Sequence, residues 1–147
     1  MPGLRIICEG EVIEADLLED DAPRICAYMR SVLPMDGTMV HAKFAGEETI
    51  VMVPFFAEQE NPKLNVVPGD IGYYPGRQTI CLFYGETKPF GEVSYFARVR
   101  SNLDGLARVG RGEGFSVLMA GVEFLEDSEH RARAVLALGE LGDPRAL

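Results

Sequence analysis

The sequence predicts a mainly β fold: a closed β-barrel of about eight strands, with one helix over a barrel opening and a second helix at the C-terminal end. Two aromatic, β-prone runs meet across Pro75 and Gly76 within residues 67–85, which is typical of a β-hairpin whose turn takes its positive φ from Gly76. Residues 21–33 have helical spacing and lie between segments with strand spacing. An antiparallel sheet of about eight strands can close into a barrel that its own side chains fill.

Strand spacing accounts for most of the chain outside the helices. Apolar and polar residues alternate in short runs, with Gly46–Glu48 expected to form a turn between two of them. In the run Val93–Arg100, the two-residue period places Phe96 and Arg98 on one face and Tyr95 on the other. We expect strands at Leu4–Cys8, Val12–Leu18, Thr38–Ala45, Thr49–Val53, twice within 67–85, at Val93–Arg100 and at Phe115–Phe124.

The predicted helix of residues 21–33 is expected to cover one opening of the barrel. Asp20 or Asp21 can accept hydrogen bonds from the backbone amides of its first turn. Pro34 and Gly37 end the helical pattern. The side chains expected to face the barrel are Ile25, Cys26, Met29 and Val32.

Composition and charge limit the classes of partner. A chain of 147 residues with 47% hydrophobic content can bury a core as one compact unit. Its formal net charge of −9 opposes phosphate backbones and anionic membranes, so we expect neither nucleic acid nor a membrane as a partner. The odd number of cysteines, Cys8, Cys26 and Cys81, in apolar runs predicts buried, reduced thiols. The start of the chain turns polar too early for a signal peptide, and we therefore expect a cytoplasmic protein.

Candidate ligand-binding residues gather on the 67–85 hairpin and on the strand that follows it. Tyr74 and Phe83 would supply apolar contact area, as aromatic side chains do in most small-molecule pockets. Either Tyr95 or Arg98 would supply the polar anchor, depending on which face of their strand points inward. Because a guanidinium group binds a carboxylate through paired hydrogen bonds, the sequence favours a small anionic ligand.

His41, Lys43, Cys81 and Asp70 carry weaker signals. His41 and Lys43 share one face of their strand and are further candidate ligand-binding residues, with His41 a conceivable general base in a cleft. Cys81 lies in an apolar run, which disfavours a reactive thiolate. Asp70 follows Gly69 at the start of a strand, where its carboxylate is expected to cap turn amides.

Four arginines surround the turn at residues 101–105 of this otherwise acidic chain. Two interpretations stay open: the guanidinium groups form an anion site, or Asp104 and Glu113 neutralise them. The sequence contains no Gly-rich phosphate loop, zinc-ligand spacing or nucleophile elbow, so we expect no cofactor and no metal and assign no catalytic residue. The arginines are Arg98, Arg100, Arg108 and Arg111.

Three segments carry a family resemblance. Ala22-Pro23-Arg24 opens the helix, and residues 69–75 and 83–85 read Gly-Asp-Ile-Gly-Tyr-Tyr-Pro and Phe-Tyr-Gly. Together they resemble uncharacterised prokaryotic cyclophilin-like proteins, which are small closed β-barrels. The resemblance covers residues 4–124 and implies the barrel fold without implying an activity.

The resemblance to active prolyl isomerases ends at their catalytic motifs. Those enzymes carry an arginine in a Phe-His-Arg context and a Trp or His in the proline pocket. The corresponding region of this chain reads His41-Ala42-Lys43-Phe44, and the chain has no Trp. Lysine lacks the planar fork of arginine, so we expect prolyl isomerase activity to be absent or very weak.

Residues 127–147 are predicted to form a helical tail outside a barrel domain of residues 1–126. Residue 127 or 128 can cap a helix that runs to about Leu138. The segment Arg133–Leu147 resembles the helix and turn of short HEAT-like repeats, such as those of phycobilisome-lyase relatives. One incomplete repeat cannot form a solenoid, so we expect an amphipathic helix that docks on the barrel or on a partner chain.

Taken together, the sequence favours a non-enzymatic barrel that binds a small anionic molecule or a peptide. Two other classes stay open. One is a diverged enzyme, either a prolyl isomerase remnant or a module associated with amide hydrolases. The other is a protein-interaction module that uses the tail helix, with a homo-oligomer among the assemblies it would allow.

Overall fold

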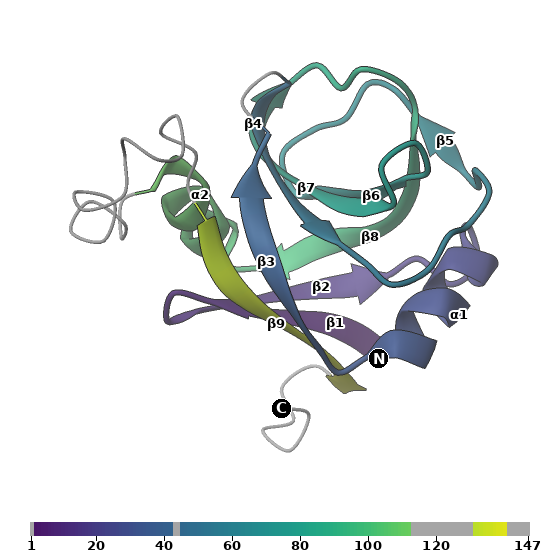
Figure 1. Ribbon diagram of the computed structural model, residues 1–147, viewed down its shortest axis with the longest axis horizontal. Helices are drawn as coiled ribbons and strands as arrows, with labels where there is room; N and C mark the ends of the chain where they lie inside the picture. Colours follow the sequence, from purple (N-terminus) through teal and green to yellow (C-terminus); the bar gives the residue numbers. More distant parts are fainter. Residues whose placement is uncertain (1, 43–44, 113–130, 141–147) are drawn as a thin grey trace.

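The structure is a computed structural model of the 147-residue chain, and it describes residues 2–42, 45–112 and 131–140. The described part is mainly β, with nine strands in one sheet and two helices against it (Figure 1). The strands are β1 (Pro2–Cys8), β2 (Glu11–Leu17), β3 (Met35–His41), β4 (Gly46–Met52), β5 (Pro62–Lys63), β6 (Asp70–Tyr74), β7 (Thr79–Thr87), β8 (Val93–Ser101) and β9 (Arg131–Glu140). The helices are α1 (Pro23–Val32) and α2 (Leu103–Arg111).

Strand pairing links eight of these strands into a ring. Their order is β2-β1-β9-β3-β4-β7-β6-β8, and β2 also pairs with β8, so the pairings return to their start. Each described pairing is antiparallel, and β5 adds to β8 outside the ring. We refer to the eight strands as the barrel. The mainly β fold predicted from the alternation is confirmed.

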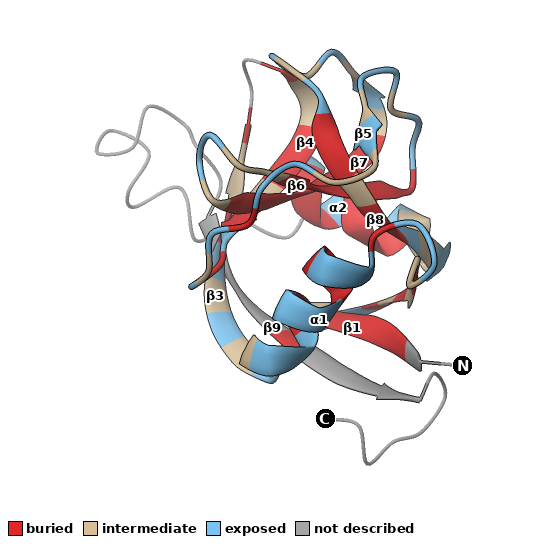
Figure 2. Cartoon of the chain, turned by 90° about the vertical axis from the view of Figure 1, so that its right-hand side faces the viewer, coloured by how far each residue is buried: buried red, intermediate tan, exposed pale blue. Residues whose placement is uncertain are grey.

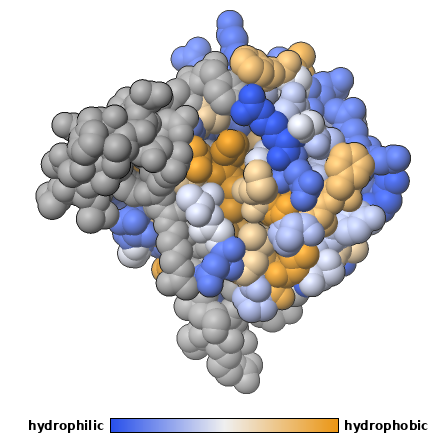
Figure 3. Space-filling model, in the orientation of Figure 1, coloured by the Kyte–Doolittle hydropathy of each residue, from blue (hydrophilic) through white to orange (hydrophobic). Residues whose placement is uncertain are grey.

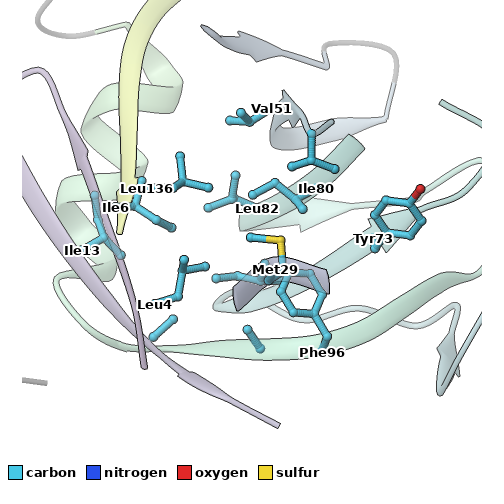
Figure 4. Close-up of a cluster of buried hydrophobic side chains, with 14 of the residues drawn as sticks. Leu4, Ile6, Ile13, Met29, Val51, Tyr73, Ile80, Leu82, Phe96 and Leu136 are labelled. Carbon is cyan, nitrogen blue, oxygen red and sulfur yellow. The ribbon is translucent and has the colours of Figure 1, made fainter. Parts of the chain in front are cut away.

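Apolar side chains fill the inside of the barrel. Alternate residues of β7, such as Ile80 and Leu82, point inward and are fully buried. They meet Leu4 from β1, Phe96 from β8 and Met29 from α1 (Figure 4). This shared core fixes the strands whose outer faces carry the candidate site.

Helix α1 covers one end of the barrel, as the sequence predicts. Ile25, Cys26 and Met29 are buried, whereas Val32, in the last turn, is only half-buried. Figure 2 shows the buried side of α1 turned toward the strands and its other side exposed. No helix in the described part of the chain has the length and apolar character needed to cross a membrane.

The N-terminus of α1 has a different cap from the one predicted. Neither Asp20 nor Asp21 caps it; the Glu60 carboxylate accepts hydrogen bonds from the backbone amides of Arg24 and Ile25, at 3.2 and 2.9 Å. Glu60 is distant in sequence, so the local capping rule could not identify it.

The β6–β7 turn also differs in detail from the prediction. It spans residues 75–78, and Arg77 and Gln78 donate backbone hydrogen bonds to the carbonyls of Tyr74 and Pro75. The positive φ belongs to Gln78, at 56°, and not to Gly76. The connection has four residues, and the last of them takes the left-handed conformation. The prediction assumed a shorter turn centred on Pro75 and Gly76.

Residues 131–140 form strand β9, although the sequence predicted a helix there. β9 pairs antiparallel with β1 and with β3 and so occupies a position within the barrel (Figure 1). Leu136 is buried in the core. Ala, Leu and Arg favour helices, but unpaired edges on both neighbours supply backbone partners that override this preference. The described part of the predicted tail therefore belongs to the barrel and not to a HEAT-like helix, and the predicted strand at Phe115–Phe124 lies outside the described residues.

Helix α2 occupies a region for which the sequence analysis predicted a turn. Asn102 precedes it with φ of 68°, and its side chain accepts a hydrogen bond from Gly105 N at 3.1 Å. Gly112 ends it with φ of 76°. Gly105 and Gly110 lower the helix propensity and hide the pattern, but Gly110 packs against the Tyr84 ring, where a Cβ would clash.

Candidate functional site

A second apolar cluster lies on the outer face of the barrel. Outward-facing residues of β7, Cys81 and Phe83, pack against Val93 from β8 and are buried. Ile50 and Tyr74 pack against them and are half-buried. Because successive strand residues point to opposite faces, β7 contributes to the barrel core and to this outer cluster at the same time.

A pocket that is open to solvent lies beside the cluster. We call it the outer pocket. Its floor comes from β4 and β7 through Glu48, Ile50, Thr79 and Cys81. Its walls come from Tyr74 and Arg77 at the β6–β7 hairpin and from Pro89 and Phe90 of the loop between β7 and β8. Apolar side chains thus surround a small number of polar groups.

Glu48 is the buried acid of the outer pocket, with 5% of its surface exposed. Burial raises the pKa of Glu48 above its ordinary value, although the Cys81 thiol and the positive charge of Arg77 act in the opposite direction. Among the described residues, no cationic nitrogen is within ion-pair distance of Glu48. Burial therefore shifts the balance of Glu48 toward its neutral form.

Cys81 does not provide a nucleophile here. Burial, followed by the neighbouring Glu48, raises the pKa of the Cys81 thiol well above its ordinary value. Cys8, Cys26 and Cys81 are all buried and free, which confirms the prediction of buried, reduced thiols.

The exposed rim gives a ligand access to this floor. Phe90 is 70% exposed, and Arg77 is exposed as well. On the face drawn in Figure 3, hydrophobic residues lie at the surface among hydrophilic ones. The large apolar side chains exposed in the described part of the chain are Val12, Tyr28, Met52, Phe56, Leu64, Val67 and Phe90.

The predicted residues Tyr74 and Phe83 lie together on this outer face. Tyr74 is half-buried and lines the outer pocket. Phe83 is fully buried beneath it in the same cluster. Phe83 therefore supports the pocket from within the cluster, while Tyr74 is accessible to a ligand.

A bulge in β8 changes the predicted assignment of faces. Ile71 pairs with Ala97, but Gly72 pairs with Tyr95, so Phe96 is an additional residue on β8. Phe96 and Ala97 are both buried in the barrel core. The strict two-residue period therefore fails within the run, and the faces predicted for it are wrong beyond Tyr95.

The bulge brings Tyr95 and Arg98 to one side of β8, where Asp70 and Lys63 join them. Lys63 Nζ lies 4.4 Å from the centre of the Tyr95 ring and donates to Asp70 Oδ2 at 2.7 Å. Arg98 donates to the other oxygen of Asp70, also at 2.7 Å. Val67 N donates to Asp70 as well, at 2.9 Å, which confirms the predicted turn cap. The guanidinium of Arg98 is thus already in an ion pair.

His41 lies in a different environment from the outer pocket. Its Nε2 is 2.6 Å from the hydroxyl of Tyr84, which belongs to the barrel core. Burial raises the pKa of Tyr84 to about 12, with a contribution from Glu47 in the same direction and one from Arg111 against it. Lys43 lies outside the described residues. The structure therefore groups Tyr74, Phe83, Tyr95 and Arg98 on the outer face but leaves His41 apart from them.

The four arginines around α2 do not converge on one anion site. Each pairs with a carboxylate that comes from another element. Of the predicted partners, Asp104 forms no ion pair within the described part of the chain, and Glu113 lies outside the described residues. The pairs and their N–O distances are Arg98–Asp70 at 2.7 Å, Arg100–Asp16 at 3.6 Å, Arg108–Glu11 at 2.8 Å and Arg111–Glu47 at 3.1 Å. The described residues also contain no group of three or more metal-ligating side chains.

Sequence reasoning missed Glu48 and Arg77. The prediction placed Gly46–Glu48 in a turn, but these residues begin β4, and strand geometry turns Glu48 toward the outer pocket. Arg77 belongs to the hairpin turn, where charged residues are usually solvated. The sequence does contain one indication for Glu48. It directly precedes the alternating run that begins at Thr49, and extending that strand backward would have included it.

Residues 6–126 match the family described as "Protein of unknown function (DUF3830)". The chain belongs to this family. Membership in DUF3830 specifies no activity. No curated protein matches this DUF3830 member in sequence.

Two solved structures are similar to this DUF3830 member. The structure of McbB in complex with tryptophan has a TM-score of 0.72 at 15% identity, covering 95% of this chain and 45% of that chain. The solution structure of the hypothetical protein AF2241 from Archaeoglobus fulgidus has a TM-score of 0.63 at 22% identity, covering 92% of each chain. The chain thus spans less than half of the McbB chain, and at these identities the likeness shows the fold alone.

Proposed function

We propose that this protein binds a small molecule with a flat apolar body and an anionic group in the outer pocket. The observation that carries the proposal is the buried Glu48 on the floor of an apolar pocket that is open to solvent. A protein seldom keeps a buried acid without an ion pair unless something else uses its proton or its hydrogen bonds. The proposal makes Glu48 part of a recognition site.

The apolar part of the ligand would lie between Tyr74, Phe90 and Val93. These side chains line the outer pocket and are apolar, as the walls of most small-molecule pockets are. A long polyanion is disfavoured because the chain has a formal net charge of −9. Tryptophan, which is present in the McbB structure, combines an aromatic body with a carboxylate and belongs to the same chemical class.

Arg77 would bind the anionic group. It lines the outer pocket and is exposed at its rim. Arg98, the anchor favoured by the sequence, is already bound to the buried Asp70. Arg77 lines the outer pocket, whereas Arg98 does not, and a guanidinium at a pocket wall can bind a ligand carboxylate through paired hydrogen bonds.

The test is calorimetric binding of phenylacetate, indole-3-acetate and tryptophan to wild type, Arg77→Ala and Arg98→Ala. We expect at least one of these acids to bind and Arg77→Ala to weaken its affinity by about tenfold, since a hydrogen bond to a charged group contributes about 1.5–3 kcal/mol. Arg98→Ala is the matched control and should leave the affinity unchanged. Absence of binding by all three acids, or a loss confined to Arg98→Ala, would contradict the proposal.

The interaction module based on a tail helix has no support from residues 131–140, because they form a strand of the barrel. The enzymatic alternative is addressed by a protease-coupled assay with a proline peptide, in which we expect little or no turnover. Robust turnover would contradict the binding proposal and favour prolyl isomerase activity instead.

A further inference from the structure

A second hollow lies beside helix α1, and none of its residues lines the outer pocket. Helix α1 contributes Arg24 and Tyr28, and the segment between β4 and β5 contributes Phe56, Ala57 and Glu58. The cavity volume of about 270 Å³ is close to the lower end of the range for small-molecule pockets, about 300–1,000 Å³. We call it the helix hollow.

The aromatic wall of the helix hollow is held in place by the barrel core. Tyr28 stacks on Phe55, and Phe55 stacks on the fully buried Tyr73, with ring centres 5.3 Å apart in each pair. The Tyr73 hydroxyl also accepts a hydrogen bond from Ala57 N and donates one to the carbonyl of Phe55, both at 3.1 Å. These bonds fix the backbone on both sides of Phe56, whose side chain is exposed. Tyr28 and Phe56 therefore offer apolar surface that is accessible and already ordered.

Arg24 is oriented by Glu60. The Glu60 carboxylate accepts a hydrogen bond from Nε of Arg24 at 3.1 Å, and Glu60 N donates to the hydroxyl of the buried Ser94 at 2.9 Å. The other two guanidinium nitrogens, Nη1 and Nη2, form no hydrogen bond with the part of the chain that the structure describes. A guanidinium that is fixed through Nε can offer these remaining donors to the carboxylate of a ligand.

Glu58 brings an unpaired negative charge to the same hollow. It lines the helix hollow, and among the described residues it forms neither a side-chain hydrogen bond nor an ion pair. The positive charge of Arg24 is already paired with Glu60. An anion alone would therefore meet two carboxylates and one guanidinium, which disfavours its binding. A ligand with a cationic group next to an anionic group complements both Glu58 and Arg24.

We propose that the helix hollow binds a free amino acid with a large apolar side chain. The carboxylate of the amino acid binds Nη1 and Nη2 of Arg24, and its ammonium group pairs with Glu58. Its side chain packs against Tyr28 and Phe56. This site is separate from the outer pocket, and it requires both charges, whereas the ligand proposed for the outer pocket requires an anionic group.

The test is calorimetric titration with L-phenylalanine and with two analogues that each lack one charged group. 2-Phenylethylamine has no carboxylate, and 3-phenylpropionate has no amine. The titrations use Arg77→Ala protein, in which acid binding by the outer pocket is expected to be weak. We expect each analogue to bind about tenfold more weakly than phenylalanine, because each leaves one charged side chain without its ligand partner.

Two substitutions added to the Arg77→Ala protein assign each charge to its side chain. Arg24→Gln and Glu58→Gln should each weaken phenylalanine binding by about tenfold. Arg24→Gln should not weaken 2-phenylethylamine, which has no carboxylate to lose, and Glu58→Gln should not weaken 3-phenylpropionate, which has no amine. Arg30→Gln is the matched control, because Arg30 is also on α1 but pairs with Glu19 and does not line the helix hollow.

Three results would overturn the inference. The first is that phenylalanine does not bind, and the second is that its affinity is the same with and without Arg24→Gln and Glu58→Gln in folded proteins. The third is that 2-phenylethylamine binds as tightly as phenylalanine, which would assign the hollow to amines and leave Arg24 without a role. The function proposed for the outer pocket is decided separately, by the effect of Arg77→Ala on the binding of acids without an amine.

Discussion

Two buried carboxylates on the outer face of the barrel have opposite environments. Asp70, at the start of β6, is 1% exposed and forms ion pairs with Lys63 and Arg98 at 2.7 Å each. Glu48, on β4, is 5% exposed and has no ion pair among the described residues. Charge compensation gives the Asp70 carboxylate a structural role, whereas the Glu48 carboxylate, which lacks it, lies in the pocket for which we propose ligand binding.

The difference follows from what covers each end of the outer face. At the Asp70 end, residues 62–63 pair with β8 as β5, and Lys63 from this strand reaches the carboxylate. At the Glu48 end, Pro89 and Phe90 of the loop between β7 and β8 line the outer pocket, and Phe90 is exposed. A fully covered carboxylate must be paired, while one beside an open pocket can be paired by a ligand.

The largest effect should come from removing the compensated carboxylate. Asp70→Ala leaves Lys63 and Arg98 without their partner and removes the acceptor for Val67 N. We expect the free energy of unfolding to fall by about 3 kcal/mol, toward the lower end for a broken buried pair because both cations are partly exposed. Urea denaturation measures this change. A loss below about 1 kcal/mol would mean that the Asp70 region is no more structural than a surface ion pair.

A smaller effect of opposite sign is expected for the uncompensated carboxylate. Burial raises the pKa of Glu48 in the folded state, so the favourable contribution of the neutral acid is complete below the unfolded pKa of about 4.5 and is lost as pH rises through the folded pKa. Glu48→Gln is neutral at every pH. It should therefore leave the free energy of unfolding unchanged near pH 4 and raise it by about 1 kcal/mol near pH 8, the size typical of one altered buried polar group.

Urea denaturation at the two pH values provides the measurement for Glu48→Gln. Glu47→Gln, on the neighbouring residue of the same strand, serves as the control and should show no such gain with pH. Equal differences between Glu48→Gln and wild type at both pH values would show that Glu48 does not titrate in this range, and the contrast with Asp70 would lose its electrostatic basis.

The local patterns that predicted the fold could not predict the features that depend on contacts between residues far apart in the sequence. Alternation and helical spacing depend on neighbouring residues, and they identified α1 and most of the strands. β9 is a strand because β1 and β3 offer it backbone partners, and the cap of α1 comes from Glu60, more than thirty residues away. No window of sequence around either element contains that information.

The candidate site was predicted in part for the same reason. Tyr74 was identified from its place in an aromatic hairpin, and the structure puts it in the outer pocket. Arg98 was expected to face a ligand, but Asp70 binds it through a register that the bulge at Phe96 determines. Glu48 was missed because it was placed in a turn, and a strand pattern does not show that it lines a pocket together with Pro89 and Phe90 of a distant loop.

The smallest effect on stability should come from Phe90, the exposed aromatic residue that lines the outer pocket. It is 70% exposed, so Phe90→Ala should change the free energy of unfolding by less than about 0.5 kcal/mol. It lines the outer pocket, however, and its loss should weaken the binding of phenylacetate by about threefold to tenfold, because an apolar wall is removed. Phe56→Ala is the matched control: Phe56 is 62% exposed but borders a different hollow, beside Arg24 and Tyr28. Calorimetry should show weaker binding in Phe90→Ala and unchanged binding in Phe56→Ala, and equal affinities in both variants would mean that the open end of the outer face does not contact the ligand.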